Sequence, residues 1–136
     1  MMRPSLHIQT ITNQIAAMQC NFPEFTYRRE NNIPTWRGTL QPSDNSPVYS
    51  VKIVYPIPRS PKVWVLAPAL RSDFPHHYPD QSLCLYYPSD YSWTSGKLIS
   101  QTIVPWTSLW LAYYEIWCVT RIWYGQEVQH SGAKIA

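Results

Sequence analysis

Apolar side chains occupy every second position from Tyr49 to Tyr55. A period of two is typical of a β-strand with one buried face, because successive side chains point to opposite faces. Residues 41–47 before this run have the composition of a turn, and three prolines within residues 56–61 end it. The pattern therefore predicts a strand with fixed ends, and the other elements are placed around it.

Three further segments show the same period of two: Phe25 with Tyr27, Trp36 with Leu40, and residues 62–67, in which Val63, Val65 and Ala67 share a face. We interpret both Val63 and Trp64 as sheet core. Gly38 lies between the two apolar residues of the second strand. Sequential strands with short links indicate an antiparallel meander of four strands.

Two segments have helical spacing. In residues 5–20 the apolar stripe consists of Ile8, Ile11, Ile15 and Met18, with Ser5 as the expected N-cap. After Pro105, which suits a first helical turn, aromatic residues recur at Trp106, Trp110, Tyr113 and Trp117. This spacing favours a core face over a surface that stacks nucleobases. The order helix, strands, irregular stretch, helix predicts an α+β fold.

A chain of 136 residues accommodates one ordinary domain, and we expect residues 1–136 to form it. The net charge of +3 is small and dispersed, so we expect no nucleic-acid partner.

Pro105, Glu115 and Arg121 interrupt the most apolar stretch, residues 103–123, which argues against a membrane span. Residues 1–5 lack a signal-peptide pattern, so we expect the protein to stay in the cytoplasm. Four glycines and no glycine-rich loop predict no nucleotide cofactor.

Cys84 is the cysteine whose surroundings suggest chemistry. The three cysteines, Cys20, Cys84 and Cys118, are odd in number and far apart, which does not indicate a disulfide framework. Cys84 lies in an irregular, proline-rich segment with His76 and His77 before it, so its thiol could act as a nucleophile. The alternative is a small buried apolar residue between two leucines. No CxxC or HxxxH spacing supports a metal site, and none is expected.

Three local patterns occur in the order found in ubiquitin-conjugating enzymes. Residues 55–63, Tyr-Pro-Ile-Pro-Arg-Ser-Pro-Lys-Val, resemble the family's Tyr-Pro-x-x-Pro-Pro-x-Val signature. Residues 77–85 resemble its His-Pro-Asn … Gly-x-Ile-Cys-Leu segment, and Trp93 resembles the Trp that follows the cysteine. The resemblance covers about residues 5–120. It implies the ubiquitin-conjugating-enzyme (UBC-like) fold, with an N-terminal helix, a four-stranded antiparallel meander, an active-site loop and a large C-terminal helix.

Residues 78–88, Tyr-Pro-Asp-Gln-Ser-Leu-Cys-Leu-Tyr-Tyr-Pro, look like the compact prokaryotic E2-like enzymes of CBASS anti-phage operons. The last two helices of the eukaryotic fold are expected to be missing. In that context the family conjugates the C-terminus of a cGAS-like nucleotidyltransferase to target molecules. The resemblance thus implies that nucleotidyltransferase, or another ubiquitin-like cargo protein, as the partner. It also implies an amine acceptor, and a separate activating enzyme is a further candidate partner.

The resemblance also implies roles for individual residues. Cys84 is the thioester-forming nucleophile, His77 is a candidate for orienting or proton transfer, and Asp80 for stabilising the intermediate or activating a lysine. A groove for the partner's tail is expected to include Tyr78, Tyr86, Tyr87 and Trp93. The Asn of His-Pro-Asn is absent, and Asp80, His76 or a backbone N–H could substitute for it.

Two alternatives to an enzyme remain at this point. The first is an inert UBC-like module that binds a partner protein. The missing Asn favours it, and the retained Ser-Leu-Cys-Leu sequence opposes it. The second is a single-stranded nucleic-acid binder that uses exposed Trp and Tyr side chains, which binding of a labelled oligonucleotide at low salt would test.

Overall fold

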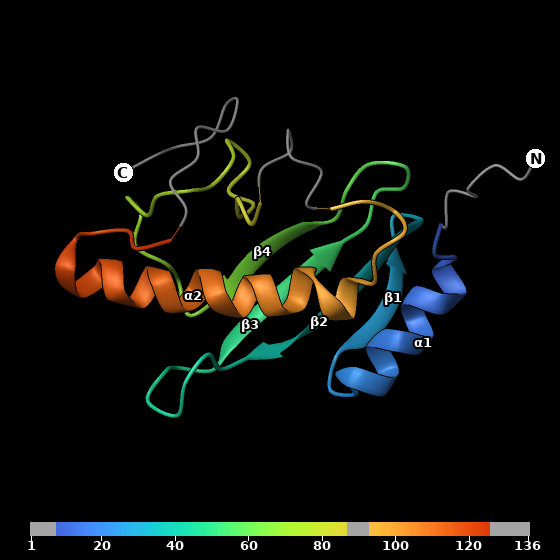
Figure 1. The fold of residues 1–136 in the computed structure, drawn as a ribbon, viewed down its shortest axis with the longest axis horizontal. Coiled ribbons are helices and arrows are strands. Elements are labelled where there is room, and N and C mark those ends of the chain that lie inside the picture. Colours follow the sequence, from blue (N-terminus) through green and yellow to red (C-terminus); the bar gives the residue numbers. More distant parts are fainter. Residues whose placement is uncertain (1–7, 87–92, 126–136) are drawn as a thin grey trace, which may run out of the picture.

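The computed structural model describes residues 8–86 and 93–125. Figure 1 shows an N-terminal helix, a four-stranded sheet and a long C-terminal helix in the predicted order. The elements are α1 (Ile11–Asn21), β1 (Thr26–Glu30), β2 (Ile33–Leu40), β3 (Tyr49–Val54), β4 (Lys62–Ala67), the 3₁₀ turn η2 (Ile99–Gln101) and α2 (Ile103–Thr120). The sheet order is β1-β2-β3-β4 with antiparallel pairing throughout. The α+β class and the meander are confirmed.

The strand register separates a core face of the sheet from a polar face. One cross-strand row on the core face consists of Tyr27, Trp36, Ile53 and Val63. The neighbouring row on the opposite face consists of Thr26, Arg37, Lys52 and Trp64. The Lys52 ammonium lies 5.1 Å from the Trp64 ring centroid, a cation–π contact. The prediction that Trp64 belongs to the sheet core is therefore wrong, because it points away from Val63.

The fourth strand also departs from the predicted pattern at its end. Val63 is fully buried, Val65 is half-buried and Ala67 is exposed. The pairing between β3 and β4 shifts register between Ser50 and Val51. Such an irregularity bends the strand locally, so a strict period of two no longer assigns residues to faces beyond it.

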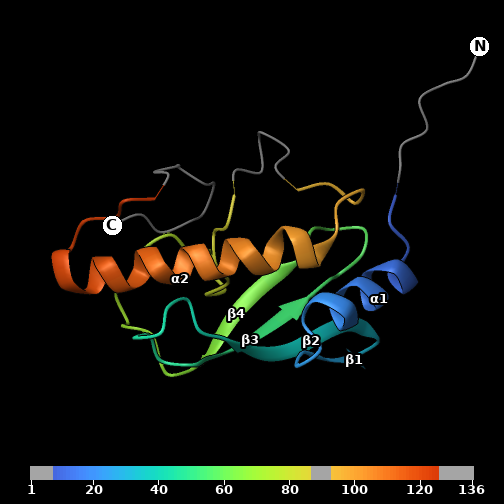
Figure 2. The same cartoon turned by 60° about the horizontal axis from the view of Figure 1, so that its bottom comes forward.

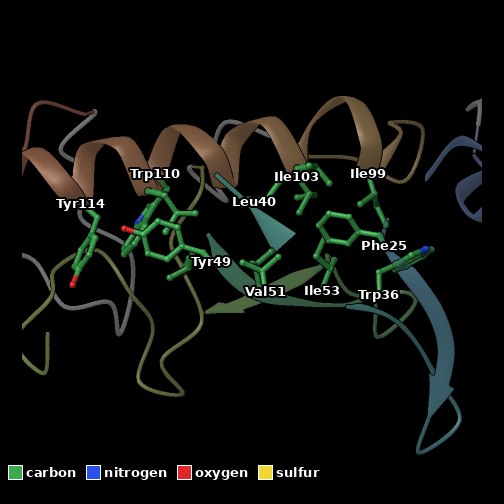
Figure 3. Close-up of a cluster of buried hydrophobic side chains, with 14 of the residues drawn as sticks. Phe25, Trp36, Leu40, Tyr49, Val51, Ile53, Ile99, Ile103, Trp110 and Tyr114 are labelled. Carbon is green, nitrogen blue, oxygen red and sulfur yellow. The ribbon is translucent and has the colours of Figure 1, made fainter. Parts of the chain in front are cut away.

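Helix α2 crosses one face of the sheet, and α1 lies beside edge strand β1 (Figure 2). Apolar side chains from the strands point toward α2 in Figure 3, where Trp110 lies beside Tyr49 and Ile103 belongs to the same buried cluster as Val51. Gly38 in β2 allows the Phe25 ring to pack directly on the strand backbone. A Cβ on Gly38 would lie 2.5 Å from Cγ of Phe25. Only a residue without a side chain lets the Phe25 ring cover the strand here.

The N-terminal helix begins later than predicted. Thr10 is the N-cap, and its hydroxyl oxygen accepts a hydrogen bond from the Asn13 amide at 3.0 Å. Ile8 therefore precedes the helix and is 61% exposed, and the expected cap Ser5 lies outside the described residues. The fully buried face carries Met18 and the polar residue Gln14. Gln14 is satisfied because its side chain bonds the Ile99 amide and the Lys97 carbonyl, each at 2.9 Å.

Helix α2 begins at Ile103, so Pro105 lies in its first turn, where a missing N–H costs nothing. The aromatic residues predicted to share one core face of α2 differ in burial. Trp110 and Trp117 are buried, whereas Trp106 and Tyr113 are only half-buried. Within residues 8–86 and 93–125, no helix combines the length and apolarity needed to cross a membrane.

Candidate active site

Residues 76–84 form a short antiparallel hairpin beside β4, termed here the cysteine hairpin. The Cys84 amide donates to the His76 carbonyl at 2.9 Å, His77 pairs with Leu83, and the Tyr78 amide donates to the Ser82 carbonyl at 2.8 Å. The turn between the two arms is closed by the Gln81 amide, which donates to the Tyr78 carbonyl at 2.8 Å.

This pairing decides which side chains lie near Cys84. Cross-strand partners share a face, and so do residues two positions apart, which places His76, Tyr78, Ser82 and Cys84 on one side of the hairpin. His77 and Leu83 take the other side. The observed contacts agree, because the His77 ring packs on Phe74 at 4.3 Å and Leu83 is part of the core.

Cys84 is buried, with 7% of its surface exposed. Burial raises the pKa of its thiol to about 12; a hydrogen bond with the Tyr78 side chain works in the opposite direction, and the negative charge of Asp80 adds to the rise. The side chain is therefore a thiol at neutral pH. A nucleophilic role would require conditions that stabilise the thiolate.

An aromatic pocket of about 250 Å³ lies against Cys84. Its wall includes His76 at the start of the cysteine hairpin and Tyr86 just after it. Trp106 and Tyr113 of α2 and Trp123 beyond α2 are also part of this wall. Ring contacts hold this wall together: the His76 and Trp123 centroids are 4.6 Å apart, and those of Tyr86 and Trp106 are 5.5 Å apart. The pocket suits an apolar or planar group brought close to the sulfur.

Trp123 reaches this wall through a sharp turn at the end of α2. Arg121 has a left-handed backbone with φ of 63° and ends the helix. The chain then turns back, so that the Trp123 ring contacts both Trp110 and Tyr113. Because this placement depends on the turn, helical spacing alone could not assign Trp123 to the site.

A second pocket, of about 420 Å³, lies on the other side of the segment that leaves Cys84. It is lined by Ser60 and Pro61 of the β3–β4 loop and by Tyr78 and Asp80 of the cysteine hairpin. Leu85 and Tyr86 line both pockets. Leu85 and Tyr86, the two residues after Cys84, thus lie between the aromatic pocket and this second pocket.

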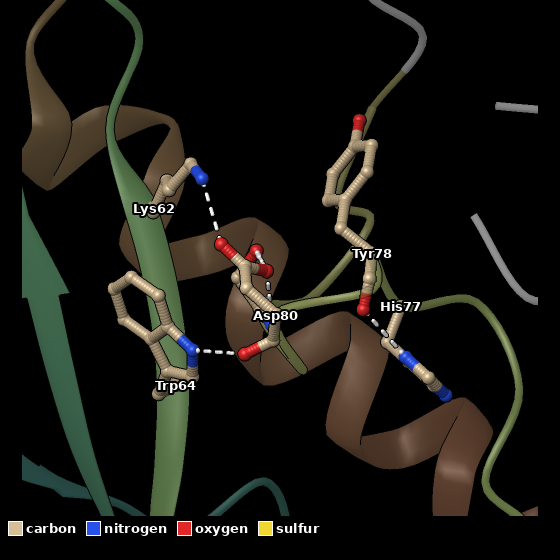
Figure 4. A network of polar contacts seen from close by, with 6 residues as sticks. Lys62, Trp64, His77, Tyr78 and Asp80 are labelled. Atoms are coloured by element: carbon tan, nitrogen blue, oxygen red, sulfur yellow. Dashed lines mark hydrogen bonds and ion pairs between the residues drawn. The ribbon is translucent and has the colours of Figure 1, made fainter. Parts of the chain in front are cut away.

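His77 lies away from the thiol. Its Nδ1 is 2.8 Å from the Tyr78 carbonyl oxygen, while its buried Nε2 has no hydrogen-bond partner among the described residues. Figure 4 shows the His77 and Tyr78 rings leaving the backbone in different directions. Among the described residues, the hydrogen bond of the His77 ring is to the Tyr78 carbonyl and not to Cys84. The geometry gives His77 the capacity to hold the hairpin, and its participation in chemistry stays a prediction.

Asp80 closes the turn of the cysteine hairpin. One carboxylate oxygen accepts from the Ser82 amide at 3.0 Å and from its hydroxyl, and the other accepts from Lys62 Nζ at 2.7 Å (Figure 4). Burial would raise the pKa of Asp80, but the bonds from Lys62 and Ser82 outweigh it and lower that pKa to about 2. An ionised carboxylate with both oxygens engaged is a weak proton acceptor, which favours turn capping as its role.

The four residues expected to bind a partner differ in burial and position. Tyr78 and Tyr86 are half-buried and line pockets next to Cys84. Tyr87 lies outside the described residues. Trp93 is only 8% exposed and packs edge-on against Tyr55, with centroids 6.0 Å apart, and its contact with a partner stays a prediction. Trp93 is a core residue and offers little surface to a partner.

The sequence analysis did not assign Trp123 to the site, and it interpreted Trp106 and Tyr113 as core residues. Trp106 and Tyr113 have the spacing of a core face, and their half-exposure could be foreseen only with the hairpin in place. The described residues, 8–86 and 93–125, contain no group of three His, Cys, Asp or Glu side chains that could hold a metal ion.

Comparison with known families connects this geometry to a protein class. The family model for Type II CBASS E2 proteins matches residues 14–131. The matched range includes most of α1, the whole sheet, the cysteine hairpin and α2. A comparison with curated proteins found no match.

Proposed function

Because the chain belongs to the Type II CBASS E2 protein family, we propose that it is an E2-like conjugating enzyme that uses Cys84 as its nucleophile. It acts in CBASS anti-phage defence as one cytoplasmic UBC-like domain. Cys84 carries the C-terminal carboxyl of a protein partner as a thioester. The partner is a cGAS-like nucleotidyltransferase or another ubiquitin-like cargo protein, and the acyl group passes to an amine acceptor.

Both steps are exchanges at one acyl carbon. In loading, the Cys84 thiol loses its proton to solvent and its sulfur attacks an acyl thioester held by an activating enzyme; a C–S bond forms, the old C–S bond breaks, and the departing sulfur takes the electron pair and a proton. In transfer, an amine nitrogen attacks the same carbon, a C–N bond forms, and the electron pair of the C–Sγ bond returns to Cys84. The amine proton passes to solvent. A sulfur nucleophile suits both steps because it attacks and leaves readily.

The observation that carries the proposal is the position of Cys84 at the end of the cysteine hairpin and against an aromatic pocket, within a chain of this family. The other cysteines lie elsewhere: Cys20 is exposed on α1, and Cys118 is partly buried on α2. The pocket offers apolar and aromatic surface for the last residues of the partner's tail. Tyr86 belongs to that surface, Tyr87 is proposed to extend it, and His77 to hold the hairpin through the Tyr78 carbonyl.

Intact mass under non-reducing conditions tests the proposal. The full chain is co-expressed with the neighbouring proteins of its operon, and its mass is measured with and without added thiol. We expect a thiol-sensitive increment on wild type and on the Cys20→Ala and Cys118→Ala variants, but not on Cys84→Ala. The increment identifies the cargo by its mass. An increment lost only in Cys118→Ala would show that the site is wrongly assigned.

The inert partner-binding module is the second candidate, and the burial of Cys84 favours it. A thiol that is 7% exposed, with a pKa raised to about 12 chiefly by burial, is a weak nucleophile in the free protein. This candidate predicts a stable non-covalent complex from the same co-expression and no mass increment on any variant. Thioester chemistry predicts a mass increment on wild type that is absent from Cys84→Ala, so the same preparation distinguishes the enzyme from the inert module.

A further inference from the structure

The aromatic pocket is the space against which Cys84 lies. Cys84 lines this pocket and does not line the second, larger pocket, which lies beyond Leu85 and Tyr86. Only 7% of the Cys84 surface is exposed. An acyl group bound to its sulfur therefore starts at the wall of the aromatic pocket, and the shape and chemistry of that pocket act on the group first.

Hydrogen bonds and ring contacts hold the wall of this pocket in place. The His76 carbonyl accepts from the Cys84 amide at 2.9 Å and from Trp110 Nε1 at 3.2 Å, so one oxygen ties the cysteine hairpin to α2. The centroid of the Trp123 ring lies 4.6 Å from that of His76 and 5.9 Å from that of Tyr113. A wall held in this way is largely preformed, as small-molecule sites usually are.

A glycine allows two of these rings to pack closely. A Cβ on Gly125 would lie 2.7 Å from Trp123 Nε1 and 2.7 Å from Tyr113 Cδ2. Any larger residue would push one of the two rings aside. Gly125 itself lines the pocket, so the chain beyond Arg121 contributes both a ring and a stretch of backbone to the wall.

The wall offers apolar surface and no formal charge. Six of the described residues that line it carry a ring, two are leucines, and none is Asp, Glu, Lys or Arg. A charged side chain placed here would lose water without gaining a partner of opposite charge, whereas an apolar side chain gains contacts. The volume of about 250 Å³ is slightly below the range of small-molecule sites, roughly 300–1,000 Å³. The pocket therefore suits one large side chain and not a folded surface.

We infer that the aromatic pocket is the subsite for a large apolar side chain carried by one of the last two residues of the cargo's tail. The inference deepens the proposed function and rests on it for the thioester that brings this tail to Cys84. The last two residues are specified because their side chains lie within a few bonds of the acyl carbon. Trp123 and Leu109 are the specificity-determining residues: Trp123 supplies a ring held by its neighbours, and Leu109 is a wall residue that solvent reaches, with 52% of its surface exposed.

Synthetic peptide thioesters test the subsite without an activating enzyme. The full chain carries Cys20→Ser and Cys118→Ala, so that Cys84 is the remaining thiol. It exchanges with mercaptoethanesulfonate thioesters of four acetylated dipeptides, Phe-Gly, Gly-Phe, Glu-Gly and Gly-Gly, and loading is followed by mass. Each rate is divided by the rate of the same thioester with glutathione, which removes intrinsic differences in reactivity. We expect one of the Phe peptides to load about tenfold faster than Gly-Gly, because the pocket buries its ring. Glu-Gly should load no faster than Gly-Gly.

Two variants connect this preference to the wall. Trp123→Leu removes a ring and should reduce the preference for the Phe peptide by about threefold or more, with thermal unfolding measured alongside because Trp123 is buried. Leu109→Lys changes an exposed position and should raise the Glu-Gly rate by roughly threefold, since its ammonium attracts the carboxylate. Ile116→Lys is the matched control: Ile116 is 41% exposed on the same helix and lines a different pocket, so all four rates should stay unchanged.

The outcomes separate this inference from the proposed function. Equal normalised rates for the four peptides would overturn the subsite, and so would failure of all four to load Cys84. Unchanged preferences in both Trp123→Leu and Leu109→Lys would overturn it as well. On co-expression, a cargo whose last two residues both lack a large apolar side chain would contradict it. Absence of any thiol-sensitive increment on co-expression would refute the proposed function alone, because a Phe preference in the peptide series would still establish the subsite.

Discussion

The amide of Leu83 donates a hydrogen bond to the carbonyl of Val63 at 2.9 Å. This single bond fastens the cysteine hairpin to edge strand β4 at the residue that precedes Cys84. Lys62 and Trp64 hold the turn of the same hairpin, through the Asp80 carboxylate at 2.7 Å and the Asp80 carbonyl at 2.9 Å. Three consecutive residues of β4 thus position the segment that carries Cys84.

The three cysteines should differ strongly in reactivity in the native protein. Cys20 is exposed, whereas Cys84 is buried with a thiol pKa raised to about 12. We expect iodoacetamide at pH 7.5 to modify Cys20 first and Cys84 much more slowly, with the Cys84 rate still rising with pH up to pH 10. Peptide mapping after timed quenching measures both rates. In denaturant the two rates should converge, and a persistent difference there would assign the effect to sequence instead of burial.

Asp80→Asn should destabilise the fold by about 1 kcal/mol at neutral pH, since the ion pair with Lys62 is partly exposed and screened. The folded-state pKa of about 2 lies below the unfolded value, so this stabilisation is present above about pH 5 and is lost as the pH falls toward 2. Urea unfolding of both proteins from pH 7 to 2 measures the difference. Asp44→Asn is the control, because Asp44 makes none of the described ion pairs.

Tyr49→Phe should cost about 1.5–3 kcal/mol of unfolding free energy. The Tyr49 hydroxyl donates to Glu115 Oε2 at 2.7 Å, and Ser46 donates to Oε1 at 2.8 Å, so one carboxylate ties β3 and its preceding loop to α2. Denaturant unfolding compares this variant with Tyr27→Phe, whose hydroxyl makes no hydrogen bond among the described residues. Equal effects of the two substitutions would mean that the carboxylate contact contributes nothing.

Gly38→Ala should destabilise the protein by about 1–3 kcal/mol, because the added methyl overlaps the Phe25 ring, with 2.5 Å to Cγ. Thr39→Ala is an exposed change at the next position of β2 and should alter stability by less than about 0.5 kcal/mol. Thermal unfolding of the two variants provides the comparison. A Gly38→Ala protein as stable as wild type would show that Phe25 can move away at no cost.

The strands could be predicted because their burial follows a simple period. Val51, Ile53 and Val63 are fully buried, as alternation requires, and the helices follow from their apolar spacing. The errors lie where another element changes the environment of a residue. Trp64 points to the polar face, where its ring contacts the Lys52 ammonium and its Nε1 donates to the Asp80 carbonyl, and Ile8 lies outside α1 because Thr10 supplies the cap.

By itself, the sequence determined the order of elements, the α+β class and the choice of Cys84 as the residue to examine, because hydrophobic periodicity and local motifs are properties of neighbouring residues. Only the tertiary structure decided what surrounds that sulfur. The pairing of residues 76–84 places Tyr78 and Cys84 on one side of the hairpin and turns His77 toward Phe74, and the turn at Arg121 adds Trp123 to the pocket. These contacts join segments far apart in the chain, or depend on backbone turns that no periodicity specifies.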